Sequence, residues 1–263
     1  MKRLLLPISF LYSIVLFLRH KLYDWKILKS KSYDIPNICV GNLNLGGTSK
    51  TPHIEYLTNL LSENYKIAIL SRGYGRDTKG FILADESHTH HDIGDEPLQY
   101  FKKFKDIKVA VDENRCEGME RLLQEENPPQ VVLLDDAYQH RKIKPGLNIL
   151  LTDYYNLYSK SHLVPAGNLR DIKKAAQRAD IIVATKSPNV ITPYYRRDVE
   201  GSLKLLPHQK IFYSYIEYLD FKPFSKISYE TDIKETKTAL LLCGIANTYS
   251  LEDYLKKKYN TIS

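Results

Sequence analysis

A glycine-rich turn at residues 41–49 joins a short apolar run to a helical pattern, and this stretch restricts the fold more than any other in the chain. After the turn, apolar residues recur at helical spacing (Ile54, Leu57, Leu60 and Leu61), so a helix begins near Lys50 and Thr51. Pro52 suits that position because the first turn of a helix needs no intrahelical donor from its N–H. A strand, a glycine-rich turn and a helix that starts at Lys-Thr predict a phosphate-binding loop.

The backbone amides of such a loop, together with the positive end of its helix dipole, hold phosphate oxygens. Lys50 then reaches the terminal phosphates of a nucleotide, and the Thr51 hydroxyl binds Mg²⁺. The residues predicted to bind the nucleotide are Gly46, Gly47, Thr48, Ser49, Lys50 and Thr51. The usual pattern has glycine at the positions of Asn44 and Ser49, so a plain strand-to-helix turn is the alternative.

The composition is that of a globular protein with anionic partners. Its 263 residues, 43% of them hydrophobic, are enough for one sizeable α/β core and a smaller second unit. The 3 cysteines have no paired spacing, which disfavours a disulfide framework or a zinc site and fits a reducing cytosol. The net charge of +7 favours nucleic acid, anionic lipid or a phosphorylated substrate, or else reflects a lysine-rich solvated surface.

Residues 4–18 are almost wholly apolar and have basic residues on both sides. The run is shorter than the roughly 20 residues of a spanning helix, and no small-residue cleavage site follows it, which disfavours a secretory signal. Its apolar residues lie on more than one helix face, and its basic and aromatic flanks suit a helix dipped into the inner leaflet. We therefore predict a membrane-associated helix within residues 1–28, attached from the cytoplasmic side.

Short apolar runs alternate with helical patterns between residues 29 and 205. The expected strands are 38–40, 65–70, 108–111, 131–134, 148–152 and 181–185. Asp135 and Asp136 directly follow one of these buried strands, which is where phosphate-loop enzymes carry a carboxylate for Mg²⁺. The alternation predicts an α/β fold, a P-loop NTPase-like parallel sheet with its site at the carboxyl ends of the strands.

Two further segments place polar groups where a strand ends or a helix begins. Residues 71–76 (SRGYGR) indicate either a loop that approaches anions closely or a plain turn. Asp95 and Glu96 precede Pro97 at the start of a helical pattern, as caps or, beside a phosphate loop, as a base for phosphoryl transfer. Three histidines at 88–91 lack a second ligand pair, which disfavours a metal site there.

The alternation loosens in the last part of the chain. The expected elements there are an aromatic β ribbon at 211–218 and 221–224, a strand at 238–244, and a helix at 251–259 capped by Ser250. We expect residues 206–263 to comprise this ribbon as a linker and a partial α/β domain that is too small to bury its own core.

Six motifs occur in the order Gly-Gly-Thr-x-Lys-Thr-Pro, Ser-Arg-Gly-Tyr-Gly-Arg, Gly-Asp-Glu-Pro, Asp-Asp-x-aromatic-Gln-His-Arg, Pro-Ala-Gly-x-Leu-Arg and Gly-Ile-Ala. Together they resemble the tetraacyldisaccharide 4′-kinase family, the lipid A 4′-kinases, from the apolar N-terminus to about Tyr259. The sequence departs from this family at Ser49, where the family usually has Gly, and at Asp171, where it has Glu. The family's Asp-His-His motif in the second domain does not occur here, so we expect that domain to be incomplete.

The resemblance implies transfer of the ATP γ-phosphate to the 4′-hydroxyl of a tetraacyldisaccharide 1-phosphate, an acylated glucosamine disaccharide, in lipid A biosynthesis. It implies as catalytic residues Asp95, which accepts the proton of the sugar hydroxyl, with Lys50, His140 and Arg170. It implies Mg²⁺ bound by Thr51, Asp135, Asp136 and Asp171, and substrate contacts from Arg72 and Tyr74. The N-terminal helix would hold the enzyme at the cytoplasmic face of the bacterial inner membrane as a peripheral or monotopic protein.

Two other classes of function are alternatives. The first is a P-loop nucleotide-dependent switch or chaperone ATPase without a lipid substrate. Thr185-Lys186 is followed here by Ser187-Pro188, so the aspartate of a guanine-reading Thr-Lys-x-Asp motif is missing. The second is a nucleic-acid-binding ATPase, which needs aromatic residues interleaved with Lys and Arg. The cluster at 194–197 (YYRR) is a weak match, so we expect no nucleic-acid partner.

Overall fold

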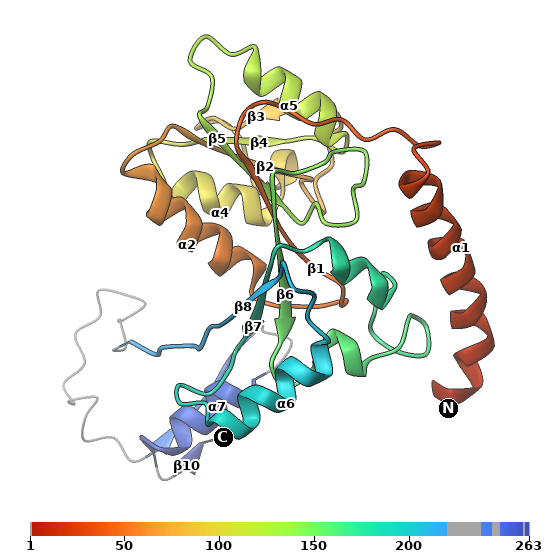
Figure 1. Cartoon of the computed structure of the whole chain (residues 1–263). Coiled ribbons are helices and arrows are strands. Elements are labelled where there is room, and N and C mark those ends of the chain that lie inside the picture. The colour runs from red at the N-terminus through yellow and green to blue at the C-terminus, as the bar shows by residue number, and fades with distance from the viewer. Residues whose placement is uncertain (1, 220–237, 244–247, 260, 263) are drawn as a thin grey trace, which may run out of the picture. The chain divides into compact units, whose positions relative to one another are not determined.

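The computed structural model describes residues 2–219, 238–243, 248–259 and 261–262, and the chain divides into two compact units. The first unit, Met1–Tyr215, contains an eight-stranded sheet with the strand order β3-β4-β2-β5-β1-β6-β7-β8 (Figure 1). Neighbouring strands run parallel except β3 and β4, which are antiparallel. The predicted P-loop NTPase-like parallel sheet is confirmed.

The strands of this sheet are β1 (Asn37–Asn42), β2 (Ile67–Ser71), β3 (Ile82–Leu83), β4 (Lys108–Val111), β5 (Val131–Asp135), β6 (Leu147–Asp153), β7 (Ile181–Thr185) and β8 (Lys210–Tyr213). The α-helices are α1 (Leu6–Asp24), α2 (Lys50–Ser62), α3 (His90–Ile93), α4 (Asp95–Lys103), α5 (Arg115–Leu123) and α6 (Pro193–Leu203). Short 3₁₀ helices are η1 (Lys2–Leu5), η2 (Tyr158–Lys160) and η3 (Lys173–Arg178). The second unit, Ile216–Ser263, contains β9 (Thr238–Ala239), α7 (Tyr249–Lys256) and β10 (Thr261–Ile262).

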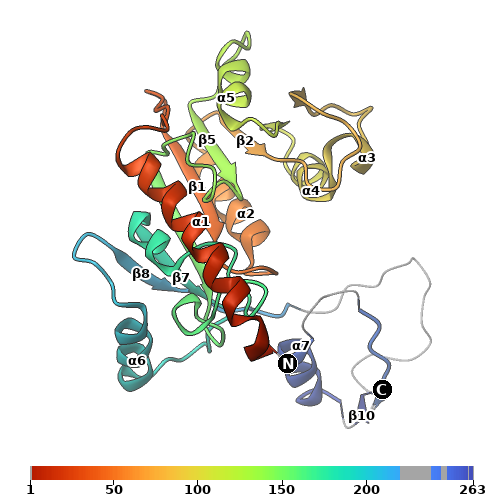
Figure 2. The same cartoon turned by 90° about the vertical axis from the view of Figure 1, so that its right-hand side faces the viewer.

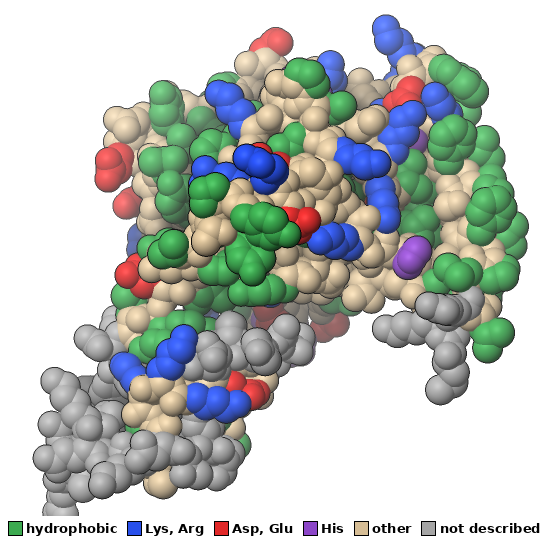
Figure 3. Space-filling model, turned by 60° about the horizontal axis from the view of Figure 1, so that its bottom comes forward, with side chains coloured by type: hydrophobic (Ala, Val, Ile, Leu, Met, Phe, Trp, Pro, Cys, Tyr) green, Lys and Arg blue, Asp and Glu red, His purple; other side chains and the backbone are tan. Residues whose placement is uncertain are grey.

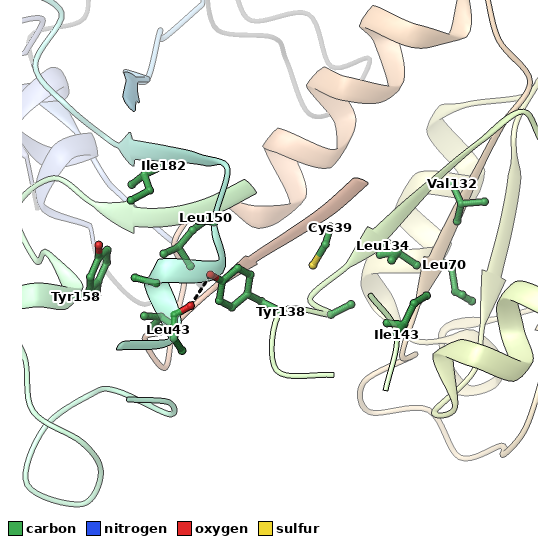
Figure 4. Close-up of a cluster of buried hydrophobic side chains, with 14 of the residues drawn as sticks. Cys39, Leu43, Leu70, Val132, Leu134, Tyr138, Ile143, Leu150, Tyr158 and Ile182 are labelled. Carbon is green, nitrogen blue, oxygen red and sulfur yellow. Dashed lines mark hydrogen bonds between the residues drawn. The ribbon is translucent and has the colours of Figure 1, made fainter. Parts of the chain in front are cut away.

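Helices bury both faces of the large sheet, so its strands are nearly continuous apolar runs. On one face, residues of α5, η3 and α6 cover the strands around Tyr138. The Tyr138 hydroxyl donates to the carbonyl oxygen of Ala175 (2.8 Å), the dashed bond in Figure 4, and so ties the segment after β5 to η3. On the other face, Ile54 of α2 and Tyr100 of α4 are fully buried against the sheet. The two layers hold the carboxyl ends of the strands in fixed positions.

Helix α1 lies along one side of the first unit and contacts it through polar groups (Figures 1 and 2). The Ser9 hydroxyl donates to the carbonyl oxygen of Leu163 (3.0 Å), and the amide of Ala166 donates back to Ser9 Oγ (3.0 Å). Further along the helix, Arg19 donates to the carbonyl oxygen of Gln139 (3.0 Å). The side of α1 that faces the protein is therefore hydrogen-bonded rather than purely apolar.

The opposite side of α1 exposes its apolar side chains. Phe10, Leu11 and Val15 are each more than 60% exposed, as is Leu4 of η1 just before the helix, and Trp25 just after it is 65% exposed. In Figure 3, hydrophobic side chains (green) follow the right-hand edge of the molecule, where α1 lies in Figure 1. Within the residues that the structure describes, no helix is both long and apolar enough to cross a membrane.

The structure corrects the sequence analysis beyond residue 205. Residues 210–213 form β8, which pairs in parallel with β7, so this part of the predicted aromatic ribbon is an edge strand of the large sheet. The boundary predicted between 205 and 206 thus separates β8 from its sheet, whereas the units divide after Tyr215. The second ribbon segment, 221–224, lies outside the described residues. Helix α7 begins earlier than predicted, with Thr248 rather than Ser250 at its N-cap.

Candidate active site

The loop between β1 and α2 has the backbone form of an anion-binding loop. Gly46 has a φ of 103°, and Ser49, the N-cap of α2, lies in the left-handed region with φ 62° and ψ 36°. Asn42 at the end of β1 donates from Nδ2 to Thr48 Oγ1 (2.7 Å) and to the carbonyl oxygen of Gly46 (3.3 Å). These bonds close the loop onto the strand that leads into it. A positive φ favours glycine, so serine at position 49 costs on the order of 1 kcal/mol.

Lys50, at the first position of α2, points to the end of β5. Its Nζ lies 3.9 Å from Oδ1 of Asp136, the residue directly after that strand. Arg170 binds both oxygens of the same carboxylate, with NH1 donating to Oδ2 (2.9 Å) and NH2 to Oδ1. Burial opposes ionisation of Asp136, but the Arg170 hydrogen bonds and the Lys50 charge outweigh it and hold the pKa of this carboxyl below its usual value. Asp136 is therefore a charged anchor for two cations.

Asp135, the last residue of β5, is buried beneath Asp136. Its Oδ2 accepts hydrogen bonds from Ser71 Oγ and from the hydroxyl of Tyr100, both at 3.4 Å, while its Oδ1 is buried without a partner among the described residues. Burial, followed by the charges of Glu96 and Asp136, raises the pKa of Asp135 to about 7. A buried carboxylate oxygen without a hydrogen bond is available to a cation.

The starts of α2 and α4 meet beside this pair. Thr51 Oγ1 donates to Glu96 Oε1 (3.2 Å), which joins the first turns of the two helices. Asp95, the first residue of α4, is exposed. The predicted phosphate-loop residues and the predicted base therefore lie on adjacent helix N-termini, where the positive ends of both dipoles favour anions.

Two glycines bring the 71–76 loop against the start of α4. Gly73 has a φ of 70°, and a Cβ there would lie 2.9 Å from the carbonyl oxygen of Ile93. Gly94 has a φ of 90°, and a Cβ there would lie 2.9 Å from the carbonyl oxygen of Tyr74. The two loops thus pack backbone against backbone, which keeps Tyr74 near Asp95. Tyr74 itself is 85% exposed and free to contact a large substrate.

His140 and Arg115 lie near the end of β5. Burial, followed by the positive charges of Arg115, Arg72 and Arg19, lowers the pKa of His140 to about 4. Arg115, at the start of α5, is almost fully buried and donates to the carbonyl oxygens of Asp112 (2.5 Å) and Asp135 (3.4 Å). His140 is therefore a neutral imidazole at pH 7, and the electrostatic environment is positive.

A family model described as tetraacyldisaccharide-1-P 4′-kinase matches residues 1–263. The chain belongs to this family. It is 47% identical over 261 residues to the tetraacyldisaccharide 4′-kinase of Flavobacterium johnsoniae, covering 98% of this chain and 76% of that protein. It is also 47% identical to the tetraacyldisaccharide 4′-kinase of Parabacteroides distasonis, covering 97% of this chain and 71% of that protein.

A solved structure of this kinase family is similar throughout. The crystal structure of LpxK from Aquifex aeolicus in complex with ATP matches with a TM-score of 0.76 and 32% identity. The match covers 100% of this chain and 81% of that chain. The resemblance inferred from the six motifs and the predicted lipid A 4′-kinase class are confirmed.

Within this kinase chain, Asp171, an expected metal ligand, contacts residues of α1 and η3 rather than residues of the phosphate loop. Its Oδ1 lies 2.6 Å from Nε2 of His20 on α1 and accepts from the amide of Ile172 (2.8 Å), and its Oδ2 lies 3.7 Å from NH2 of Arg178. These contacts leave the buried carboxylate committed to α1 and η3. The neighbouring Arg170 does reach the site, where it binds Asp136.

The oxygen donors beside the loop suit Mg²⁺, the hard cation expected in this kinase. The Thr51 hydroxyl, the Glu96 carboxylate and the unpartnered Oδ1 of Asp135 are oxygen ligands of the type that Mg²⁺ prefers. No cluster of three His, Cys, Asp or Glu side chains in the described part of the chain has the geometry of a complete protein-held metal site. Mg²⁺ characteristically keeps waters and substrate oxygens in its shell, so an incomplete protein set fits this ion.

Sequence reasoning missed four residues of this region. Arg115 and Tyr100 are buried beneath Asp135, and Lys186 and His53 contact the phosphate loop itself. Lys186 lies in the Thr-Lys segment that lacks the aspartate of a guanine-reading motif, and its position directly after a buried strand is the signal in the sequence. Arg115, Tyr100 and His53 sit in ordinary amphipathic helices, and nothing in their spacing marks them.

Proposed function

We propose that the protein transfers the γ-phosphate of ATP to the 4′-hydroxyl of a tetraacyldisaccharide 1-phosphate, an acylated glucosamine disaccharide, at a membrane surface. Membership of the kinase family supports the reaction, and the ATP complex of the Aquifex aeolicus relative supports the nucleotide. The observation that carries the proposal is the contact of Lys50 and Arg170 with the single carboxylate of Asp136 at the mouth of a phosphate loop.

The phosphate side of the reaction falls to the loop and these two cations. The amides of residues 46–51 bind phosphate oxygens, and Lys50 places its charge against the terminal phosphates. Arg170, fixed in direction by Asp136 and by the carbonyl oxygen of Asn42 (3.3 Å), presents a guanidinium to the charge that spreads over the transferred group. His140, a neutral imidazole near these cations, can donate a hydrogen bond to the phosphate.

Mg²⁺ would be held by Thr51, Glu96 and Asp135, and would neutralise charge on the β- and γ-phosphate oxygens. Of the predicted ligands, Asp136 is bound on both oxygens by Arg170, and Asp171 is bound by His20 and Arg178. Of the three aspartates expected as metal ligands, we therefore keep Asp135. Glu96 takes the place of the two others in the proposed ligand set. The conformation of Thr51 and Glu96 is already set by their mutual hydrogen bond.

Asp95 is the base of this proposal. It is exposed at the start of α4, one residue from the Glu96 that contacts Thr51, and can accept the proton of an incoming sugar hydroxyl. Arg72 and Tyr74, both exposed on the adjoining loop, are placed to contact the disaccharide. The aromatic ring of Tyr74 offers a flat apolar surface to a sugar, and Arg72 offers charge to a phosphate.

Attachment to the membrane follows from the exposed apolar side of α1. A helix with an apolar face and basic and aromatic residues at its end lies in the plane of the bilayer interface. We propose that α1 holds the protein at the cytoplasmic face of the bacterial inner membrane as a peripheral or monotopic protein. The lipid substrate would reach the site from the same surface.

The test is incubation of the protein with [γ-³²P]ATP, Mg²⁺ and the disaccharide 1-phosphate lipid in detergent, followed by separation of the lipid product. A new labelled phosphomonoester on the lipid is the expected result. ATP hydrolysis without label in the lipid would contradict the proposal and would favour a nucleotide-dependent switch. The Lys50→Ala protein is the negative control. A contaminating kinase would label the lipid in both preparations, so absence of label with this variant attributes the reaction to the protein itself.

A further inference from the structure

The carbonyl groups of a phosphate loop need partners that lie away from the phosphate. In a loop that binds an anion, successive amides point inward, and a carbonyl that turned inward would repel the phosphate oxygens. Two carbonyl oxygens of this loop, those of Gly47 and Ser49, contact side chains that lie outside the loop. Lys186 Nζ donates to the carbonyl oxygen of Gly47 at 2.7 Å, and His53 Nδ1 lies 2.7 Å from the carbonyl oxygen of Ser49.

Lys186 reaches the loop from the carboxyl end of β7. It directly follows the last residue of that strand, in a left-handed conformation with φ 55°. Its Nζ also lies 3.2 Å from Oδ2 of Asp153, the last residue of the adjacent β6. The ammonium is therefore fixed by a sheet carboxylate on one side and donates to the loop on the other. Because β6 also pairs with β1, the strand that enters the loop, this bridge spans three neighbouring strands.

His53 holds the other carbonyl from the first turn of α2. Its Nδ1 contacts the Ser49 carbonyl oxygen, and its Nε2 lies 3.2 Å from the hydroxyl of Ser214, just after β8. A neutral imidazole that donates from Nδ1 and accepts at Nε2 satisfies both bonds. Burial lowers the pKa of His53, which agrees with this neutral form. The residue whose carbonyl is held is also the one in a strained backbone conformation, Ser49.

We propose that Lys186 and His53 are positioning residues that hold the phosphate loop in its anion-binding form through the carbonyl groups of Gly47 and Ser49. The inference rests on the proposed nucleotide site. Neither side chain needs to touch the nucleotide: each fixes a carbonyl, and the amides between these carbonyls are thereby aimed at the phosphate. His53 also compensates for the cost of a serine where the family has glycine, because its hydrogen bond favours the left-handed conformation that Ser49 adopts.

The test of Lys186 is the Lys186→Asn variant. Asparagine tolerates a left-handed backbone, so the turn is kept while the side chain is too short to reach Gly47. Loss of one charge-assisted hydrogen bond is expected to weaken ATP binding about tenfold in calorimetry, to raise KM for ATP and to leave kcat at saturating ATP within about twofold. Lys204→Asn is the matched control, since Lys204 also has a left-handed backbone (φ 52°) but is exposed at the end of α6.

The test of His53 is a double-mutant cycle with Ser49. His53→Leu is expected to weaken ATP binding about tenfold in the parent, but clearly less in a Ser49→Gly background, because glycine needs no help to adopt a positive φ. His208→Leu, at an exposed position, is the control and should leave ATP binding unchanged. Equal losses in both backgrounds would overturn the role of His53, and restored affinity in Lys186→Arg but not in Lys186→Asn would support that of Lys186.

The outcomes separate this inference from the proposed function. If the parent protein fails to bind ATP with Mg²⁺, the nucleotide site itself is wrong. If the parent binds ATP and both folded variants bind it equally well, the nucleotide site stands and the positioning role is overturned. A variant that lowers the melting temperature without changing ATP affinity shows a structural role only, and this result also overturns the inference.

Discussion

Arg170 binds both carboxylate oxygens of Asp136, and this bond separates the functions of two adjacent aspartates. With Asp136 committed to Arg170 and facing Lys50, the buried Asp135 keeps one oxygen without a partner among the described residues. In the proposed site, Asp136 thus orients the two cations toward the phosphate, and Asp135 keeps an oxygen for Mg²⁺. The sequence motif Asp-Asp did not distinguish these roles, because the distinction depends on a partner 34 residues further along the chain.

The first prediction concerns Lys50. Replacement by alanine removes the positive charge that Asp136 holds beside the phosphate loop, where charge on phosphate oxygens increases in the transition state. We expect Lys50→Ala to lower phosphoryl transfer by at least about 10²-fold, measured as label transferred from ATP to lipid. Lys66→Ala, an exposed lysine of the same unit, should be unaffected. Turnover of Lys50→Ala at the parent rate would refute the assignment of the loop.

The second prediction concerns Asp95. Because this carboxylate is exposed and makes its proposed contribution only to proton transfer, Asp95→Asn should lower kcat by about 10²- to 10⁴-fold. The affinity for ATP, measured by calorimetry, should stay within about twofold of the parent. The exposed Asp106→Asn serves as the control for loss of one negative charge. A change in ATP affinity as large as the change in kcat would mean that Asp95 serves the nucleotide rather than the sugar.

The phosphate loop and the fold could be predicted from the sequence because both depend on which elements follow one another along the chain. Strand, glycine-rich turn and helix follow one another between residues 37 and 62, and the apolar runs at 131–134 and 181–185 lie in buried strands as expected. Asp171 could not be placed in this way, since its partner His20 lies 151 residues away on α1. A carboxylate next to an arginine of expected catalytic role suggests a metal ligand in the sequence, whereas tertiary packing turns it toward another helix.

The third prediction separates these two roles of Asp171. As the buried partner of His20 and Arg178, Asp171 holds α1 against the rest of the first unit. Asp171→Asn should therefore speed hydrogen exchange within residues 6–24 and cost about 1–3 kcal/mol of stability, while Mg²⁺-dependent ATP binding stays unchanged. The matched change His20→Asn should have the same effect on α1. Loss of Mg²⁺-dependent ATP binding with no change in the hydrogen exchange of α1 would show that Asp171 is a metal ligand after all.

The fourth prediction concerns the exposed side of α1. Phe10, Leu11 and Val15 are 65%, 64% and 62% exposed, so their replacement by serine should leave the folded unit intact. The triple variant is expected to lose binding to vesicles of anionic phospholipid in a sedimentation assay, because burial of apolar area in the interface drives attachment. Replacement of the exposed Tyr56 and Leu60 on α2 by serine is the control. Sedimentation of the α1 variant at the parent level would place the membrane contact elsewhere on the protein.

The last prediction concerns Asp135 and pH. The pKa of this carboxyl rises from 3.8 to about 7 in the folded protein, so the folded state holds a proton that the unfolded state has lost between these two values. The contribution of this group to stability is fully present below about pH 4 and is lost as the pH rises through 7. Asp135→Asn removes the titration, because an amide stays neutral at every pH.

We therefore expect Asp135→Asn to match the parent in melting temperature near pH 4 and to exceed it by several degrees at pH 8, in the absence of nucleotide and metal. The exposed Asp106→Asn should follow the parent at both pH values. Addition of Mg²⁺ and ATP should raise the melting temperature of the parent at pH 8, since bound cation stabilises the ionised carboxylate, and should raise that of Asp135→Asn much less. If the two proteins show the same dependence on pH and on Mg²⁺, Asp135 is neither the titrating group nor the carboxylate that holds the metal.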